Sequence, residues 1–277
     1  MSTHFAYLNG KIVPAEEAAV SIFDRGIMYG DGLFETIRMQ NRKCVRLNSH
    51  LDRLRIGAHT LKFNDILSNI DFTNAITAIC EANHLTDARV RLTITRGRSE
   101  PGKLWPVKQN EPTIIITADF LPPPSLEPVR VIISSIRRDE NNPLSAVKSL
   151  NYLPGILARI EAEQGGVDDA ILLNTRGNIV EGTIGNIFII AGNRLITPSL
   201  DQGVLPGTVR AAVLALAPEL GLDAIECPVT MQDLTNADEL FFTNAIQLVR
   251  PISEVDGKEI GAGVYAKCAH VLEMLSV

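Results

Sequence analysis

The sequence predicts a protein of two α+β domains, and three observations carry that prediction. Short alternating apolar runs and longer helical patterns follow one another without the regular strand–helix–strand order of a parallel sheet. A proline-rich stretch, "FLPPPSLEP" at residues 120–128, cannot join a helix or a sheet and favours an extended spacer. The chain has 277 residues, 45% of them hydrophobic, which is enough to bury a core without disulfides or metal. We therefore expect domains at residues 1–119 and 129–277, joined by the linker 120–128.

The first domain is expected to begin with a hairpin, because two short apolar runs flank Asn9-Gly10, a strong two-residue turn signal. Apolar residues at helical spacing then predict a helix over 49–61 with Ser49 as its N-cap. Alternation and β-branched residues predict the strands that end the domain. The other expected elements are two strands around Asn41-Arg42, a helix over 72–85, and strands over 88–97 and 112–120.

The second domain is expected to mix strands with two clear helices. One helix lies near 155–164 and is stopped by Gly165-Gly166. The other follows the Pro206-Gly207 turn. The expected strands are one over 129–136, a strand pair over 169–190, and one over 239–246.

Composition excludes several classes of protein. The formal net charge is −6 and no run of Lys and Arg with interleaved aromatics occurs, which argues against a nucleic-acid partner. The four cysteines lie far apart without a metal-binding spacing, so we expect reduced thiols and no metal. The N-terminus lacks the pattern of a signal peptide, and no apolar run is long enough to span a membrane. A cytoplasmic protein is the expectation.

Lys148 is the first candidate for chemistry. From Asn141 to Ala158 it is the only charged side chain, and its neighbours are apolar or neutral. A solvated lysine at a strand end is the simpler interpretation. A partly desolvated lysine, however, has a lowered pKa and becomes a nucleophilic amine of the kind that forms Schiff bases.

Glu181 and the turn at Pro206-Gly207 supply complementary groups. Glu181 lies between core-facing strand residues, where a carboxylate is either a water-exposed turn residue or a fixed anion beside a cationic ring nitrogen. Thr208 and Val209 open a helix after the turn, and the free N–H groups there suit a phosphate, although a well-capped helix explains them equally. Further donors for a phosphate are the guanidinium of Arg53 and the groups of Thr243 and Asn244.

These motifs together resemble one known family. The segments "FDRGIMYGDGLFETIR", "HLDRL", "KSLNYLPGILARIEA", "EGTIGNIF" and "LITPSLDQGVLPGTVR" are similar, in this order, to the class IV aminotransferases of fold type IV. That family includes branched-chain aminotransferases, D-amino acid aminotransferases and 4-amino-4-deoxychorismate lyases. The resemblance implies two α+β domains with the active site between them, the cofactor pyridoxal 5′-phosphate, and a homodimer.

The resemblance also implies roles for individual residues. Lys148 matches the Schiff-base lysine, which is both nucleophile and general acid/base, and Glu181 matches the partner of the pyridine nitrogen. Tyr152 matches an aromatic residue near the phenolic oxygen of the ring. The phosphate ligands implied are Arg53, Thr208 and Val209, with Thr243 and Asn244 completing the cup; Phe34 and Thr36 line the substrate pocket.

The substrate stays open at this point. Branched-chain enzymes typically carry Gly where this chain has Thr36, and D-amino acid enzymes place an Arg-x-His trap where it has Pro101 and Lys103. The Thr-Asn pair at 243–244 resembles the lyases, but Gln247 and Arg250 depart from their pattern.

A D-specific enzyme would therefore need another anchor for the substrate carboxylate. Its candidates are Arg25, Arg96 and Arg98, with structural pairing as the alternative for each. We expect an aminotransferase acting on a D-amino acid or a branched-chain amino acid with a 2-oxo acid, and the lyase as the alternative. A binding protein that has lost its cofactor is disfavoured, because Lys148, Glu181 and Arg53 are all present.

Overall fold

The computed structural model describes residues 4–63, 70–100, 102, 104–105, 111–261, 263 and 265–276. The chain forms two compact units. Unit 1 consists of Met1–Pro122 with Val147–Asn151, and unit 2 of Pro123–Ala146 with Tyr152–Val277. Both units combine helices with sheets that contain antiparallel pairs, which confirms the predicted α+β class.

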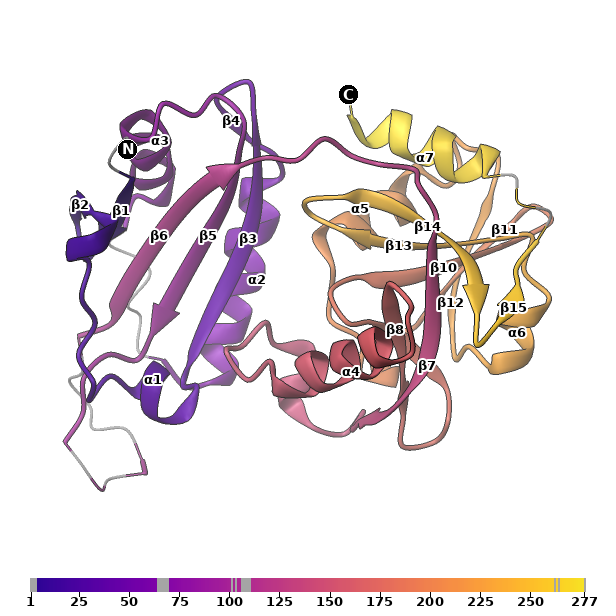
Figure 1. The fold of residues 1–277 in the computed structure, drawn as a ribbon, viewed down its shortest axis with the longest axis horizontal. Helices are drawn as coiled ribbons and strands as arrows, with labels where there is room; N and C mark the ends of the chain where they lie inside the picture. The colour runs from indigo at the N-terminus through magenta and orange to yellow at the C-terminus, as the bar shows by residue number, and fades with distance from the viewer. Residues whose placement is uncertain are drawn as a thin grey trace. The chain divides into compact units, whose positions relative to one another are not determined.

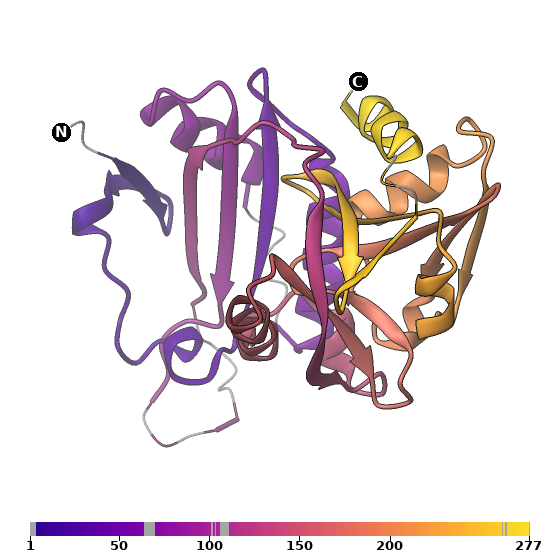
Figure 2. The ribbon, with the colours of Figure 1, turned by 45° about the vertical axis from the view of Figure 1, so that its right-hand side comes forward.

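Unit 1 is built on a six-stranded antiparallel sheet in the order β2-β1-β6-β5-β3-β4 (Figure 1). Its long central strands β3, β5 and β6 lie side by side in both views (Figure 2). The strands are β1 (Phe5–Leu8), β2 (Lys11–Pro14), β3 (Gly32–Gln40), β4 (Lys43–Cys44), β5 (Ala88–Thr95) and β6 (Thr113–Phe120). The helices are α1 (Arg25–Tyr29), α2 (Leu47–Thr60) and α3 (Phe72–Ala82), with a 3-10 turn at Ala15–Glu17.

The core of unit 1 lies on one face of this sheet. Leu33, Ile37 and Met39 of β3 are buried in the same cluster as residues of α2 and α3. Because neighbouring strand residues point to opposite faces, Phe34 and Thr36 belong to the other face. Strand β3 thus has one face that packs on the core and an opposite face that carries Phe34 and Thr36, which we call the open face.

The turns of unit 1 follow the sequence closely. Asn9 and Gly10 have φ of 47° and 89°, the left-handed pair that a tight hairpin needs, and they join β1 to β2 as predicted. The second predicted strand pair is also confirmed, although β4 is only two residues long. Ser49 is not the N-cap of α2, because the helix already begins at Leu47, which packs against the core.

Residues 147–151 complete unit 1, although they follow a stretch of unit 2 in the sequence. The Phe34 N–H donates to the Lys148 carbonyl at 3.0 Å, and the Leu150 N–H donates to the Gly32 carbonyl at 3.0 Å. Val147 is buried in the core of unit 1. Here the structure differs from the predicted range 129–277, because backbone hydrogen bonds to β3 hold this segment.

Unit 2 contains a nine-stranded sheet that closes into a ring. Its order is β12-β11-β10-β13-β14-β7-β8-β9, with β15 paired to β14, and β9 also pairs with β10. The ring strands are β7 (Val129–Arg138), β8 (Asp169–Asn174), β9 (Ile179–Gly182), β10 (Asn186–Ala191), β13 (Glu239–Asn244) and β14 (Leu248–Val255). The outer strands are β11 (Arg194–Pro198), β12 (Asp223–Cys227) and β15 (Lys258–Glu259). The predicted strand pair over 169–190 is therefore three strands.

Helices α4, α5 and α7 pack on strands of the ring, and a separate cluster contains branched apolar side chains and Phe242, with Leu234 of α6 among them. Helix α5 packs on β13, α7 on β13 and β14, and α4 on β7 and β8 (Figures 1 and 2). Their bounds are α4 (Leu153–Gln164), α5 (Thr208–Leu216), α6 (Met231–Thr235) and α7 (Ala266–Ser276), with 3-10 turns at Pro143–Ala146 and Leu200–Gln202. Among the described helices, none is both long and apolar enough to cross a membrane.

Candidate active site

Lys148 lies in unit 1 against the open face of the sheet. Its backbone is fixed to β3 by the hydrogen bond from Phe34, and its Nζ lies 4.4 Å from the centroid of the Phe34 ring. The residue is partly buried. An ammonium over an aromatic face is attracted by the ring quadrupole, so Phe34 holds the side chain in place.

Arg53 also belongs to unit 1, on α2, and is held by a buried carboxylate. Its Nε donates to Glu35 Oε1 at 2.8 Å, and its Nη2 donates to Glu35 Oε2 at 2.6 Å. His50, one turn earlier on α2, places Nδ1 at 2.7 Å from Glu35 Oε2. This fork-to-fork pairing fixes the orientation of the guanidinium.

Electrostatics decide the charge states in this cluster. Burial opposes ionisation of Glu35, but hydrogen bonds from His50 and Arg53 and the charge of Arg53 outweigh it, so the pKa of Glu35 is lowered. Burial is the largest cause that lowers the pKa of His50, and the charges of Arg53 and Lys148 lower it further. The hydrogen bond and the charge of Glu35 act to raise it but do not outweigh these causes. We therefore assign an ionised Glu35 that accepts a hydrogen bond from a neutral His50.

Glu181 lies in unit 2 where the ring of strands closes. It stands in register with Asn186 of β10, and Asn186 stands in register with Thr243 of β13, so the three side chains share one face. Glu181 Oε1 forms an ion pair with Arg138 Nη1 at 2.5 Å. Its Oε2 accepts from Asn186 Nδ2 at 3.0 Å and from the Leu205 N–H at 3.2 Å. The carboxylate is buried, paired with Arg138 and held in one orientation.

The predicted phosphate cup lies beside this carboxylate. Helix α5 begins at Thr208, and Gly207 at the N-cap has no side chain to cap the first N–H groups. Thr208 and Val209 are both buried at this helix start. The Oγ1 of Thr243 is buried without a hydrogen-bond partner in the described part of the chain, and the Asn244 carbonyl oxygen Oδ1 accepts from the Ile246 and Gln247 N–H groups. A buried, unpaired hydroxyl and a helix start both suit an anionic group.

Tyr152 opens α4 in unit 2, and its hydroxyl donates to the Thr183 carbonyl at 3.2 Å. Thr183 follows Glu181 by two residues, so Tyr152 contacts the segment that carries Glu181. Unit 2 therefore brings together Tyr152, Glu181, Thr208, Val209, Thr243 and Asn244, whereas Lys148, Arg53, Phe34 and Thr36 belong to unit 1.

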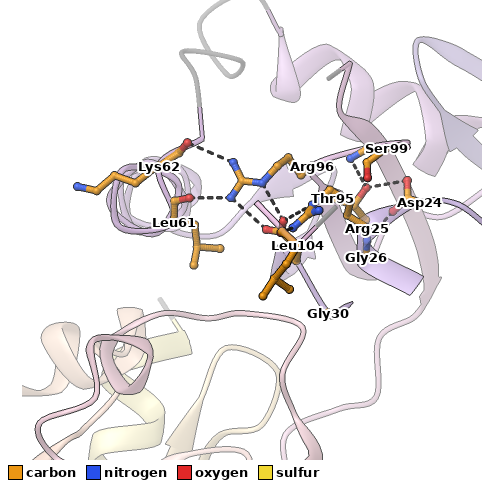
Figure 3. A network of polar contacts seen from close by, with 12 residues as sticks. Asp24, Arg25, Gly26, Gly30, Leu61, Lys62, Thr95, Arg96, Ser99 and Leu104 are labelled. Atoms are coloured by element: carbon orange, nitrogen blue, oxygen red, sulfur yellow. Dashed lines mark hydrogen bonds and ion pairs between the residues drawn. The ribbon is translucent and has the colours of Figure 1, made fainter. Parts of the chain in front are cut away.

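Two of the three candidate anchor arginines take part in a structural network (Figure 3). Arg96 donates to Asp31 at 2.8 and 3.1 Å and to the carbonyls of Leu61 and Lys62 at 2.6 and 3.1 Å. Arg25 donates to Asp31 at 2.7 Å and to the Leu104 carbonyl at 2.7 Å. Burial opposes the charge on Asp31, but its arginine partners outweigh it and lower its pKa. For Arg25 and Arg96 this geometry supports the structural pairing that was the alternative interpretation.

The remaining predicted substrate residues are placed differently. Arg98 is exposed and lies 5.8 Å from the centroid of the Phe23 ring. Thr36 is half-buried on the open face of β3, and Arg91 of β5 lies 3.9 Å from the centroid of the Phe34 ring on the same face. Pro101 and Lys103, where a carboxylate trap was considered, lie outside the described residues.

Comparison with known proteins places the chain in a family. The sequence pattern of amino-transferase class IV matches residues 32–255, and the chain belongs to that family. This confirms the resemblance seen in the motifs, and it makes the protein an enzyme. Class IV aminotransferases use pyridoxal 5′-phosphate, which confirms the predicted cofactor.

Relatives of three activities are similar to this chain over most of its length. A Methanocaldococcus jannaschii protein provisionally named a branched-chain-amino-acid aminotransferase is 43% identical over 92% of this chain and 88% of its own. Bacillus subtilis aminodeoxychorismate lyase is 30% identical over 92% and 88%, and Bacillus licheniformis D-alanine aminotransferase is 31% identical over 92% and 89%. The solved branched-chain aminotransferase of the thermophilic archaeon Thermoproteus uzoniensis with norvaline has a TM-score of 0.91 at 29% identity, covering 99% of this chain and 94% of that one.

The residues present fit this cofactor. A phosphate needs donors, which the start of α5 and the unpaired Thr243 hydroxyl supply within the described part of the chain. A pyridinium nitrogen needs a fixed anion, and Glu181 is one. The donor set thus matches both charged ends of pyridoxal 5′-phosphate.

Three positioning residues, Glu35, His50 and Arg138, were not predicted from the sequence. Glu35 could have been found, because strand alternation puts it on the same face as Leu33 and Ile37, where a carboxylate needs a partner. His50 lies three residues before Arg53 and shares its helix face. Arg138 ends β7 in an ordinary charged run, and nothing in the sequence pairs it with Glu181.

Proposed function

We propose that this chain is a pyridoxal 5′-phosphate-dependent transaminase that moves an amino group between a branched-chain amino acid and a 2-oxo acid. The observation that carries the cofactor chemistry is the buried Glu181 carboxylate, paired with Arg138 and oriented by Asn186 and Leu205. The choice of substrate class is supported by the 43% identity to the methanogen relative and by the apolar Phe34 ring beside Lys148.

Glu181 is assigned to the pyridine nitrogen. Its ion pair with Arg138 fixes a carboxylate at this position, and a carboxylate beside a ring nitrogen favours the protonated form of that nitrogen. When bound, pyridoxal 5′-phosphate supplies the electron sink that makes the substrate Cα–H acidic. Asn186 and the Leu205 N–H fix Oε2, so the carboxylate is preorganised before the cofactor arrives.

Lys148 is assigned to covalent attachment and to proton transfer at the substrate Cα. The hydrogen bonds from the Phe34 N–H to the Lys148 carbonyl and from the Leu150 N–H to the Gly32 carbonyl hold this segment on β3, and the Phe34 ring limits the positions of the Lys148 amine. A residue that both binds and moves a proton needs this positional control.

Arg53, the start of α5 and Thr243 are assigned to the phosphate. Arg53 is presented by Glu35 and His50, which are positioning residues in this proposal. Tyr152 is assigned to the phenolic oxygen of the ring, and Phe34 and Thr36 to the substrate side chain. Lys148 belongs to unit 1 and Glu181 to unit 2, so the proposed roles draw on residues of both units.

The lyase is the second candidate, supported by the Bacillus subtilis relative and by the Thr243-Asn244 pair. A D-amino acid transaminase is supported by the Bacillus licheniformis relative. The expected homodimer stays a prediction, and so does the cytoplasmic location. Sedimentation of the purified holoenzyme measures the oligomeric state.

A half-reaction panel tests the proposal. Holoenzyme is mixed without acceptor with L-leucine, D-alanine or aminodeoxychorismate, and the cofactor absorbance and the products are followed. We expect L-leucine to bleach the visible band and to yield its 2-oxo acid, and Lys148→Ala to abolish this because the proton carrier is gone. Bleaching by D-alanine alone, or pyruvate release from aminodeoxychorismate, would replace the proposed substrate with one of the alternatives. A protein that never takes up the cofactor would refute all three.

A further inference from the structure

Unit 2 contains a cavity of about 140 Å³, and of its lining residues only Asn244 is among those predicted to hold the cofactor. It lies among the ring strands, the loop after β9 and the turn after β13. Its lining residues are Val129, Arg159, Asp168, Asp169, Ile184, Gly185, Phe242, Asn244, Gln247 and Arg250. Two of them, Gln247 and Arg250, are the positions where the sequence departs from the pattern of the lyases.

Arg250 lines this cavity as a cation without a partner among the described residues. Its guanidinium has no hydrogen bond or ion pair with any of them, and its Nε is shielded from solvent. Arg250 stands in register with Phe242, which belongs to the cluster of branched apolar side chains, so both side chains point to that face. A partly buried guanidinium whose shielded Nε has no partner leaves unused hydrogen-bonding capacity, which favours an anion.

The other charges of the cavity are arranged differently. Arg159 pairs with Asp169 at 3.1 Å, and Asp169 also accepts from the Thr183 hydroxyl and its own neighbour's N–H, so that ion pair is satisfied. Asp168 has one oxygen occupied by the Arg130 N–H at 2.8 Å. Among the described residues no ion pair joins Asp168 to Arg250, although both line the cavity.

This cavity lies on the other face of β13 from Thr243, although Asn244, which is predicted to complete the phosphate cup, also lines it. Phe242 and Thr243 are neighbours on β13, so their side chains point to opposite faces of the sheet. Thr243 shares its face with Asn186 and Glu181, whereas Phe242 and Arg250 share the opposite face. A ligand in the cavity would therefore lie on the Phe242 face, and it would approach the predicted phosphate cup only at Asn244.

We propose that the cavity binds an apolar α-amino acid as a regulatory ligand. The carboxylate would pair with Arg250, the ammonium with Asp168 at the exposed rim, and the side chain would contact Val129, Ile184 and Phe242. A cavity of roughly 150 Å³ holds a molecule as large as benzene, so this one can hold a small amino acid with its end in the open mouth. The ligand belongs to the class of the proposed substrate. The regulatory role therefore rests on the proposed function, whereas the binding site itself does not.

Calorimetric titration of holoenzyme whose lysine–cofactor linkage has been reduced with borohydride tests the site. The probes are L-leucine and its 2-oxo acid, 4-methyl-2-oxopentanoate. We expect one L-leucine site per chain that weakens roughly 10- to 100-fold in Arg250→Gln, because a charge-assisted hydrogen bond is lost. Arg130→Gln, which removes an exposed arginine outside the cavity, is the matched control and should bind as the parent does.

Asp168→Asn separates the two halves of the ligand. It should weaken L-leucine binding and leave that of the 2-oxo acid unchanged, because only the amino acid carries an ammonium group. Arg250→Lys, which keeps the charge, should recover part of the affinity and so guards against a folding defect in Arg250→Gln. Absence of saturable binding by either probe, or L-leucine binding that Arg250→Gln does not change, would overturn the proposal. Failure of the half-reaction panel alone would not, because the titration measures binding without turnover and also works on the chain without cofactor.

Discussion

His50 is a buried histidine whose Nδ1 contacts the buried carboxylate of Glu35. Burial lowers its pKa, and the charges of Arg53 and Lys148 act in the same direction, against the attraction of Glu35. In the unfolded chain the histidine titrates near ~6.5. As the pH falls below that value, the unfolded chain takes up a proton that the folded chain resists, so folding becomes less stable.

We therefore predict that the unfolding free energy falls as the pH drops from 7.5 to 5.5, and that His50→Gln flattens this fall. Glutamine can still donate to Glu35, but it has no proton to gain in this window. Urea unfolding at several pH values measures the effect. His59→Gln, an exposed histidine on the same helix, is the control and should keep the parent's slope. Equal slopes for the parent and His50→Gln would contradict the assignment of a neutral His50.

At this scale the sequence predicts the residues that stand in motifs. Lys148 is conspicuous because its surroundings lack charge, and Glu181 because it interrupts core-facing residues. Arg138 could not be predicted, since its pairing with Glu181 depends on how β7, β8 and β9 are registered. The roles assigned to these residues remain predictions until the cofactor is measured on them.

The start of helix α5, with Gly207 as its N-cap, has no side-chain cap on its first N–H groups. Gly207 packs so closely that an added Cβ would lie 1.9 Å from Asn186 Oδ1 and 3.1 Å from Arg210 Cβ. Asn186 in turn donates to Glu181 and to the Leu205 carbonyl at 2.9 Å. Glycine is therefore required here by space, because its backbone φ of −72° is open to any residue.

Gly207→Ala should displace Asn186 and with it the Glu181 carboxylate. We expect a loss of about 1–3 kcal/mol in unfolding free energy, as for overpacking in general, and roughly tenfold weaker cofactor binding. Gly165→Ala at the end of α4 is the control, because its Cβ would meet only ordinary contacts from 3.4 Å outward. Equilibrium dialysis with pyridoxal 5′-phosphate and thermal unfolding measure both effects. Unchanged cofactor affinity in Gly207→Ala would contradict the role of this turn.

Most long elements could be predicted from periodicity, and short ones could not. The hairpin at Asn9-Gly10 and the helix at Thr208 agree with the structure because turn chemistry defines their ends. Helix α1 has only five residues, too few for a helical periodicity that would identify Asp24 as its N-cap. Helix α2 begins at Leu47, before the expected N-cap Ser49. The pairing of β9 with both β8 and β10 is non-local and has no signature in the chain.

At the scale of the molecule, unit 1 is discontinuous in sequence. Strand β3 pairs with β5 along its length, but β4 covers only Met39 and Gln40 on the other side. Residues 147–151 cover the beginning of that side through the bonds to Gly32 and Phe34. An uncovered strand edge beside apolar residues is a site for aggregation.

A fragment of residues 1–122 should therefore aggregate or fail to fold. The same fragment with residues 147–151 attached through a flexible linker should be more soluble, because Val147 and the covering segment are restored. Light scattering and circular dichroism of the two fragments test this. A monomeric, folded fragment 1–122 would show that the returning segment is dispensable for unit 1.

The return of Val147–Asn151 to unit 1 has a consequence for how such a chain can evolve. A single recombination event at the proline-rich linker would transfer most of unit 1 but leave Lys148 behind with the gene segment for unit 2. Each recombined chain would then combine β3 with a segment 147–151 from the other parent, and Lys148 would be separated from the rest of unit 1. The two units can therefore diverge in their loops, but they must be inherited together.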